Sequence, residues 1–543
     1  MGATLFALNH RTIVHSPAAT ILLLLTAVTI VAFAARKLPI PYPTLMVVAG
    51  AAFGWIPGLP RIEFDSDTVL LVFLPPLLYA AAWQMSWHDF RVNLRPISLL
   101  AVGLVIATTS AVAAVAHYYV PDMPWSMAFA LGALVAPPDA VAATAVTRRV
   151  PLPRKLITIL EGESLVNDAT GLVLYRVAVA AAVTGVFSPS AAALQLVVAP
   201  IGGLIVGLVV GRLAVQLHRR LNDPTIETVA TLLTPFAAYV PAEMLGTSGV
   251  IAVVAAGMYV SRHASTIFSP VTRLNATAVW QTLEFLLNGL AFILIGLELP
   301  EALAGVGRHP PGYLLRFAAL VCAAVIGVRL LWVAPAAYLP RLFARRLCPY
   351  ESTACGGNFV VLGWAGMRGV VTVAAALALP QLQTDGAPLP YRDVVVLLAF
   401  AVVLATLVVQ GQTLAAVIRW VQVAPEPKIG RNDTIEVRRE VLEAGVGFLD
   451  GALRSDESEQ AVARHLRERY DYVLSAVTSQ NDAHTATIGR LQLEVLAEQR
   501  RKLAELSAEG TVSLETVRRI ERILDLDEAR VEESLRGRSG RGE

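Results

Sequence analysis

Long apolar stretches, separated by short polar or Pro- and Gly-rich breaks, fill the first 420 residues and constrain the fold more than any other feature. A helix needs about 20 mostly apolar residues to cross a bilayer. Counting the apolar stretches of about that length predicts an all-α polytopic membrane protein with about thirteen transmembrane helices. The predicted spans are residues 17–35, 40–57, 68–86, 96–119, 124–147, 155–184, 190–216, 225–242, 247–261, 276–299, 312–338, 357–380 and 392–420.

Charge divides the chain into two parts. The first 420 residues contain 25 of the 44 Lys and Arg and 18 of the 42 Asp and Glu, and the last 123 residues contain the rest. We expect an external N-terminal segment (1–16), a transmembrane domain (17–420) and a charged helical cytoplasmic tail (421–543). Apolar residues at three- and four-residue spacing predict tail helices in Thr434–Leu449, Glu459–Val477, Ile488–Leu506 and Thr516–Leu535. The net charge of +2 predicts no nucleic-acid partner.

The basic residues of the loops predict the orientation, because Lys and Arg concentrate on the cytoplasmic side of a membrane. One alternating set of connections holds Arg36, Lys37, Arg91, Arg95, Arg148, Arg149, Arg154, Lys155, Arg212, Arg219, Arg220, Arg262, Arg273, Arg341, Arg345 and Arg346. The other set holds little beyond Arg61, Arg308 and Arg392. With thirteen spans, this bias predicts an external N-terminus and a cytoplasmic C-terminal tail.

The sixth predicted span contains the polar string EGESLVNDATGLVLY, residues 161–175. Ionisable groups inside a membrane are costly, so they are candidates for function. On a helix, Ser164 lies at i,i+4 to Asp168 and at i,i+3 to Asn167. Carboxylate, hydroxyl and amide oxygens on adjoining faces suit a hard cation. The string therefore predicts a cation site on this helix.

Two predicted spans are interrupted. Pro137 and Pro138 remove two backbone donors from the fifth span, and Asp139 follows them at the start of a second half-helix. The twelfth span contains GWAGMRG, residues 363–369, whose three glycines are poor helix formers. One broken helix in each half of a membrane protein indicates a secondary transporter built from inverted repeats.

One positively charged side chain in a predicted span needs a partner on another helix. Arg329 lies in the eleventh predicted span, which offers it no carboxylate, and an unpaired charge in that position is costly. Glu163 is the first candidate for an interhelical ion pair.

The strings EGESLVNDATGLVLY, PPDAVAATAV and GWAGMRGVVTVAAALALP together resemble the bacterial sodium/proton antiporters of the monovalent cation:proton antiporter-1 (CPA1) family. The resemblance covers essentially all of residues 17–420 in order and spacing. It implies a 13-helix antiporter fold, a homodimer, alternating access by movement of a core region, and a multi-pass position in the bacterial plasma membrane. It also implies sodium transport, a role in pH regulation, membrane lipids as neighbours and no cofactor besides the transported Na+ and H+.

The same resemblance implies roles for individual residues. Asp168 would exchange the proton for the cation, with Asp139, Ser164 and the backbone carbonyl of Pro138 as further cation ligands. Glu163 and Arg329 would form the ion pair that holds Asn167, and Arg368 would support the broken twelfth helix. An asparagine before the aspartate is associated in such families with electroneutral exchange.

The chain departs from the family pattern at two positions. The segment Leu74–Tyr79 is followed by Ala80, where family members often carry a glutamate, and Pro138 stands where a threonine is common. Both departures leave the preference among Na+, Li+ and K+ open. The residues also allow two alternatives, an intramembrane aspartyl protease that uses Asp139 and Asp168, and a cation channel, although the chain has no repeated carbonyl filter.

Overall fold

The computed structural model describes most of the chain from residue 17 onward. The described residues are 17–35, 37–38, 40–56, 66–120, 122–147, 150, 152–306, 310–343, 354–384, 386–423, 429–452, 457–478, 482–508, 520 and 523–531. The predicted external segment 1–16 lies outside these ranges, as do Arg36, Arg61, Arg148, Arg149, Arg308, Arg345 and Arg346.

The chain forms two compact units, Met1–Pro425 and Glu426–Glu543. Unit 1 is helical throughout its described residues apart from turns and an isolated bridge between Leu382 and Pro388. Its first helices are α2 (Pro17–Ala35), α3 (Tyr42–Gly54), α4 (Ser66–Gln84), α5 (Trp87–Val92), α6 (Leu94–Ser98), η1 (Leu99–Leu104), α7 (Val105–Tyr119), α8 (Trp125–Val135), α9 (Ala140–Thr147) and α10 (Arg154–Thr184).

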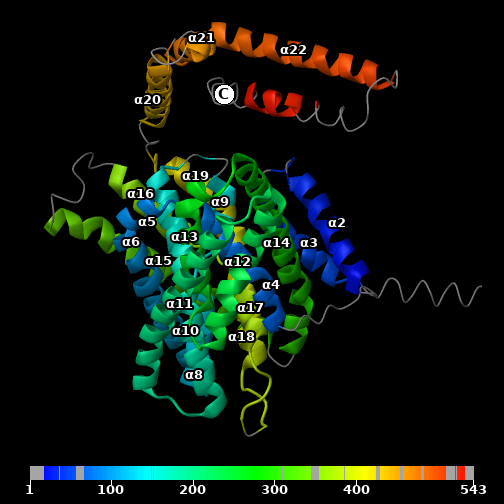
Figure 1. Cartoon of the computed structure of the whole chain (residues 1–543). Coiled ribbons are helices and arrows are strands. Elements are labelled where there is room, and N and C mark those ends of the chain that lie inside the picture. The colour runs from blue at the N-terminus through cyan, green and yellow to red at the C-terminus, as the bar shows by residue number, and fades with distance from the viewer. Residues whose placement is uncertain are drawn as a thin grey trace, which may run out of the picture. The chain divides into compact units, whose positions relative to one another are not determined.

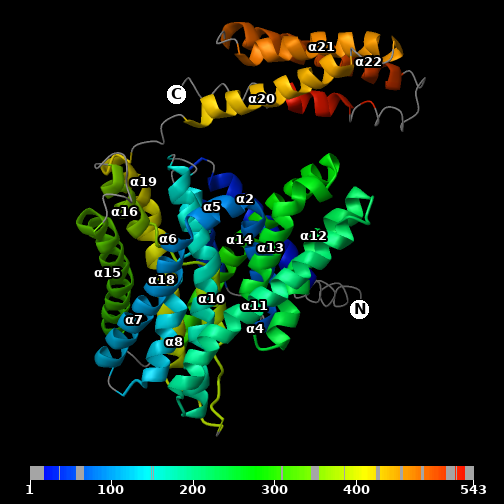
Figure 2. The same ribbon diagram turned by 60° about the vertical axis from the view of Figure 1, so that its left-hand side comes forward.

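The second half of unit 1 continues in the same way (Figure 1). Its helices are α11 (Pro189–His218), α12 (Pro224–Met244), α13 (Gly249–Ile267), α14 (Pro270–Gly305), α15 (Pro311–Phe343), α16 (Ala354–Trp364), α17 (Val370–Leu377), α18 (Arg392–Ala405), η2 (Thr406–Gln410) and α19 (Gly411–Trp420). Figure 2 shows α12, α13 and α14 on one side of unit 1 and α7, α8, α15 and α16 on the other, with α10 between the two groups.

Seven helical segments among the described residues are long and apolar enough to cross a membrane. They are Leu94–Tyr119, Arg154–Thr184, Pro189–His218, Gly249–Ile267, Pro270–Gly305, Pro311–Val333 and Arg392–Trp420, and shorter apolar helices accompany them. Helix α12, which covers the predicted span 225–242, is not one of these segments. It carries buried polar residues among its apolar ones. Thr231 of α12 accepts a hydrogen bond from the Trp280 indole at 3.1 Å, so this polarity is used in contacts with neighbouring helices.

Side-chain caps explain where several of these helices begin. The side chains of Ser188, Asp223, Ser248 and Ser269 accept backbone N–H groups at the starts of α11, α12, α13 and α14. Each cap satisfies donors that have no partner inside the helix. At Asp223 the N–H groups of Ile226 and Thr225 also hold the pKa of the carboxyl below its ordinary value.

Small residues bring α11 and α13 close together. Gly203, Gly207 and Gly211 recur every four residues along α11, and a Cβ atom at Gly207 would lie 2.3 Å from the carbonyl oxygen of Ala252 on α13. Such close backbone approach is the usual way in which helices associate in lipid, where burying apolar surface gives little advantage.

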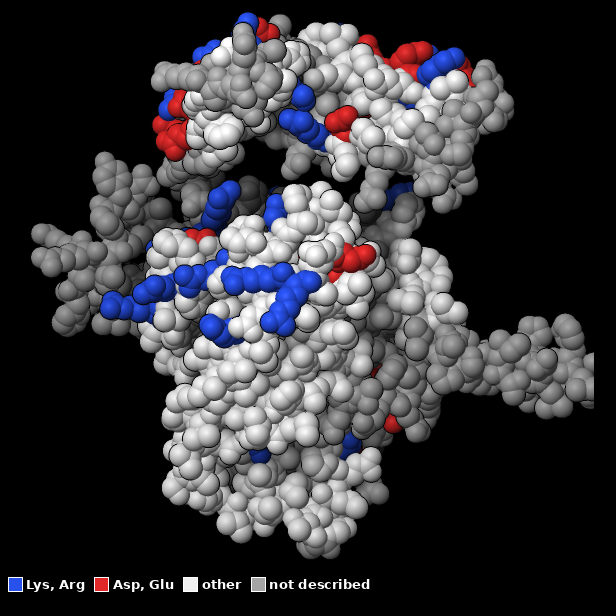
Figure 3. Space-filling view, in the orientation of Figure 1, with Lys and Arg blue, Asp and Glu red and all other residues white. Residues whose placement is uncertain are grey.

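Basic side chains gather in a band near one end of unit 1, and the broad surface beside it is almost free of charge (Figure 3). The exposed basic residues at the described helix ends include Arg91, Arg95, Arg154, Lys155, Arg212, Arg219, Arg220 and Arg262. All of them belong to the connections for which we predict a cytoplasmic location.

Unit 2 is the charged C-terminal region, and its described residues are helical. It contains α20 (Ile429–Ala452), α21 (Glu457–Thr478), α22 (Asp482–Ala508) and a further helical segment at residues 523–531. Arg467 of α21 joins Asp450 of α20 at 2.6 Å, and Arg500 of α22 joins Asp525 at 2.6 Å. These partly exposed pairs hold neighbouring helices in register, each at a modest energetic gain.

Candidate functional site

The two predicted helix breaks lie against each other. One break separates α8 from α9 at residues 136–139, and the other separates α16 from α17 at residues 365–369. The backbone N–H of Asp139 donates to the carbonyl oxygen of Met367 at 2.7 Å. Irregular backbone inside a membrane protein is stable only where its polar groups find partners. Here the two breaks supply partners to each other.

Arg368 donates hydrogen bonds to the carbonyl groups at the C-terminal end of α8. Its Nε donates to the carbonyl oxygen of Val135 at 2.8 Å and its Nη2 to that of Ala136 at 3.0 Å, while Nη1 donates to Gly366. The C-terminal end of a helix carries partial negative charge, which a guanidinium neutralises. The backbone N–H of Arg368 donates to Thr406 Oγ1 at 3.0 Å, which ties the second break to η2.

Polar residues of α10 satisfy the other side of the first break. Asn167 Nδ2 donates to the carbonyl oxygen of Pro138 at 2.9 Å, and Ser164 Oγ accepts the N–H of Ala140 at 3.2 Å. Asp139 Oδ1 accepts the N–H of Val141 at 2.8 Å and so caps α9. The other oxygen of Asp139, Oδ2, has no such bond within the described part of the chain.

A buried ion pair joins α10 to α15. Arg329 Nη1 and Nη2 donate to the two carboxylate oxygens of Glu163 at 2.5 and 2.8 Å, and each side chain is 1% exposed. The Nε of Arg329 donates to the carbonyl oxygen of Leu362, at the end of α16, at 3.1 Å. Arg329 therefore links α15 to the polar helix and to the second broken helix.

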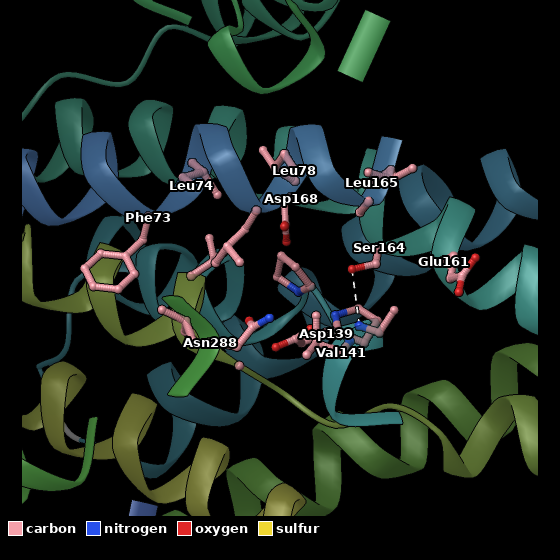
Figure 4. Close-up of a pocket in the computed structure, with 18 of the residues that line it drawn as sticks. Phe73, Leu74, Leu78, Asp139, Val141, Glu161, Ser164, Leu165, Asp168 and Asn288 are labelled. Atoms are coloured by element: carbon pink, nitrogen blue, oxygen red, sulfur yellow. Dashed lines mark hydrogen bonds between the residues drawn. The ribbon is translucent and has the colours of Figure 1, made fainter. Parts of the chain in front are cut away.

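A cavity of about 120 Å³ opens at the crossing (Figure 4). Its polar lining includes both candidate carboxylates, which face the same space. That polar lining consists of Gln84, Asp139, Thr144, Glu161, Ser164, Asp168, Glu284, Asn288 and Thr372, and apolar residues of α4, α9, α10 and α17 complete the wall. A cavity lined by four carboxylates, three hydroxyls and two side-chain amides can hold a small cation.

The structure brings together the residues that were predicted to bind the cation or to support its site. Asp168, Asp139, Ser164 and Pro138 line the cavity. Asn167, Glu163, Arg329 and Arg368 are buried beside it, each 1% exposed or less. Ala80 is buried but does not line the cavity, whereas Glu161 and Glu284 do.

Three features of the site did not follow from the sequence. Thr406 holds Arg368, Gln84 donates to Glu284 at 2.9 Å, and Asn288 of α14 faces the cavity. Asn288 had a signal that could have found it, because it is an amide within the apolar run Phe285–Leu297 and a buried polar group there is costly.

Comparison with known proteins places this architecture. Residues 21–420 match the sequence profile of the transmembrane sodium/hydrogen exchanger family. The chain belongs to the sodium/hydrogen exchanger family. The resemblance to bacterial antiporters of the CPA1 type is thereby confirmed.

Two curated relatives and one solved structure support the assignment. The exchanger is 32% identical to an uncharacterized Na+/H+ exchanger of Mycobacterium tuberculosis, over 94% of this chain and 95% of the relative. It is 33% identical to the sodium, potassium, lithium and rubidium/H+ antiporter of Bacillus subtilis, over 72% and 59%. Its fold is similar to that of the sodium proton antiporter MjNhaP1 from Methanocaldococcus jannaschii, with a TM-score of 0.56 at 19% identity, over 73% and 98%.

Family membership excludes one alternative that the sequence left open, the intramembrane aspartyl protease. Members of this family are antiporters, which are transporters rather than enzymes. The intramembrane protease interpretation of Asp139 and Asp168 is therefore wrong, even though both carboxylates face one cavity.

Proposed function

We propose that this exchanger moves a monovalent cation across the bacterial plasma membrane in exchange for protons, at the cavity between Asp139 and Asp168. The observation that carries the proposal is the position of these two carboxylates in one cavity at the crossing of two broken helices. The name of the Bacillus subtilis relative specifies sodium, potassium, lithium and rubidium, which supports monovalent cations as the class of substrate.

Competition for Asp168 couples the two fluxes. A negatively charged carboxylate in a membrane cavity is costly unless a proton or a bound cation neutralises it. Asp168 therefore binds one or the other, and the empty, ionised form does not change access. Exchange follows, because the site changes the side of the membrane to which it opens only when Asp168 carries a proton or a cation.

Four oxygen donors form the proposed cation site. They come from Asp168, from Asp139 through Oδ2, from Ser164 Oγ and from the backbone carbonyl of Pro138. Asn167 holds that carbonyl at 2.9 Å. The Glu163–Arg329 pair and Arg368 keep the surrounding helix ends in place.

The charges around the cavity support electroneutral exchange. Glu163 is neutralised by Arg329, and Asn167, which precedes Asp168, has no charge. One exchanging carboxylate that binds either one proton or one monovalent cation moves the same charge in both directions. We therefore propose a stoichiometry of one cation per proton.

We also propose the finer architecture. Thirteen crossings place residues 1–16 outside and the tail, 421–543, in the cytoplasm, and the basic band of unit 1 supports this orientation. The two broken helices support inverted repeats, with alternating access by movement of the core that contains them. The similarity to the solved antiporter supports the antiporter fold, and we expect the exchanger to work as a homodimer among membrane lipids.

The function is tested in everted membrane vesicles that carry the exchanger and a preformed pH gradient. Addition of Na+, Li+ or K+ should collapse the gradient, and the half-effective concentrations should rank the cations. Vesicles from the same strain without the exchanger provide the control. A cation flux that continues without counter-movement of protons would instead indicate a channel.

Gly369 provides a further prediction, because it lies directly against the cation site. A Cβ atom at this position would lie 1.8 Å from Asp139 Oδ2 and 2.6 Å from its Cγ, so one of the two groups must shift. We expect Gly369→Ala to displace the Asp139 carboxylate and to reduce cation-dependent proton flux by about tenfold or more. Gly312→Ala is the matched control, because nothing lies within 4 Å of a Cβ there. Equal loss in both variants would contradict the close packing.

A further inference from the structure

Asn288 is a buried amide that the proposed mechanism leaves unused. It lies in the middle of α14 between Leu287 and Gly289, and its side chain is 3% exposed. It forms no hydrogen bond with any residue in the described part of the chain, and it lines the same cavity as Asp139 and Asp168. Figure 4 shows its side chain directed into that cavity.

An amide in this position is expensive. Leaving a buried amide without a hydrogen bond destabilises a protein, whereas an apolar side chain of the same shape would pack against its apolar neighbours without that penalty. Leu287, Ala291 and Phe292 are buried around it in the same helix. The amide therefore has no partner among the described side chains, and it faces the cavity that both candidate carboxylates line.

We propose that Asn288 is a specificity-determining ligand, whose amide oxygen binds the transported cation together with Asp139, Asp168 and Ser164. This inference rests on the proposed function. An amide oxygen is a neutral, hard donor, so it adds coordination without adding a titratable group. It also comes from α14, a helix that supplies none of the other proposed ligands. Asn288 thus supplies an oxygen from a wall of the cavity that offers no other proposed ligand.

The test uses Asn288→Leu, which keeps the shape and removes the oxygen. The apparent KM for Na+ in the vesicle assay should rise about five- to tenfold while the maximal rate stays within about twofold, because one ligand oxygen is lost. The ranking of Na+, Li+ and K+ should change as well. The thermal unfolding midpoint of the purified variant should equal or exceed that of the wild type, because an unpartnered amide has been removed.

Two further variants complete the design. Asn288→Thr restores one oxygen and should recover part of the Na+ affinity. Thr282→Val lies on the same helix, where the exposed Thr282 hydroxyl donates only to the carbonyl of Ala278 at 2.9 Å, and should leave the KM unchanged. An Asn288→Leu exchanger with wild-type KM and unchanged cation ranking would overturn the inference.

Equilibrium binding of radioactive Na+ to the purified exchanger separates this inference from the proposed function. A wild-type chain that binds Na+ but exchanges no protons would overturn the function, and weaker Na+ binding by Asn288→Leu would still support the ligand. Equal Na+ affinity in the two chains would overturn the ligand, whatever the transport result.

Discussion

Asp168→Asn should abolish cation-dependent proton flux while the exchanger still folds. The amide has nearly the same shape as the carboxyl group. It does not bind a proton in the pH range of the transport assay, and it does not attract a cation as a carboxylate does. We expect the rate of gradient collapse on addition of Na+ to fall below about 1% of the wild-type rate. Because Asp168 is 8% exposed and faces the cavity, the substitution removes charge without creating a void.

Folding must be measured beside activity. The Asp168→Asn protein should elute as a single species in detergent and unfold at or above the wild-type temperature, because a buried carboxylate is costly. Asp89→Asn is the matched control, since Asp89 is exposed at the start of α5 and outside the cavity. Retained Na+-dependent flux in Asp168→Asn would remove Asp168 from the exchange mechanism.

The largest loss of stability should come from breaking the Glu163–Arg329 pair on one side only. Both side chains are 1% exposed, so Glu163→Leu leaves a buried guanidinium without its counter-charge. Removing one partner of a buried pair typically costs about 3–5 kcal/mol. We therefore expect Glu163→Leu and Arg329→Met each to lower the thermal unfolding midpoint in detergent strongly.

The double variant distinguishes an ion pair from two independent contacts. Glu163→Leu with Arg329→Met should be more stable than either single variant, because no unpaired charge remains. Recovery should still be incomplete, since the carbonyl oxygen of Leu362 loses its bond to Arg329 Nε. Additive losses in the double variant would contradict a coupled pair.

Much of the fold could be predicted because the information is local. Pro137 and Pro138 cannot continue a helix whatever surrounds them, and the break between α8 and α9 falls there. The glycines at 363, 366 and 369 predicted the second interruption because glycine is a poor helix former; the break falls at residues 365–369, and Gly363 remains within α16. The pairing of Arg329 with Glu163 followed from cost, because a charge inside a membrane needs an opposite charge on another helix.

The remaining features depend on contacts between distant segments. No local pattern states that the N–H of Asp139 meets the carbonyl of Met367, or that Thr406 of η2 accepts the N–H of Arg368. Single polar residues such as Thr406 and Asn288 occur in many apolar helices, and only the packing decides which of them face a cavity. The polar residues of α12 likewise contact neighbouring helices such as α14 through Trp280.

Uptake of radioactive Na+ into proteoliposomes that contain the purified exchanger tests the central claim most directly. With the lumen acidic and the membrane potential clamped at zero, outward movement of protons should drive Na+ inward. A membrane potential of about 100 mV should leave the Na+ accumulation unchanged, because exchange of one cation for one proton moves no net charge. Absence of pH-driven uptake would contradict cation/proton exchange. Uptake that follows the potential would contradict the one-for-one stoichiometry.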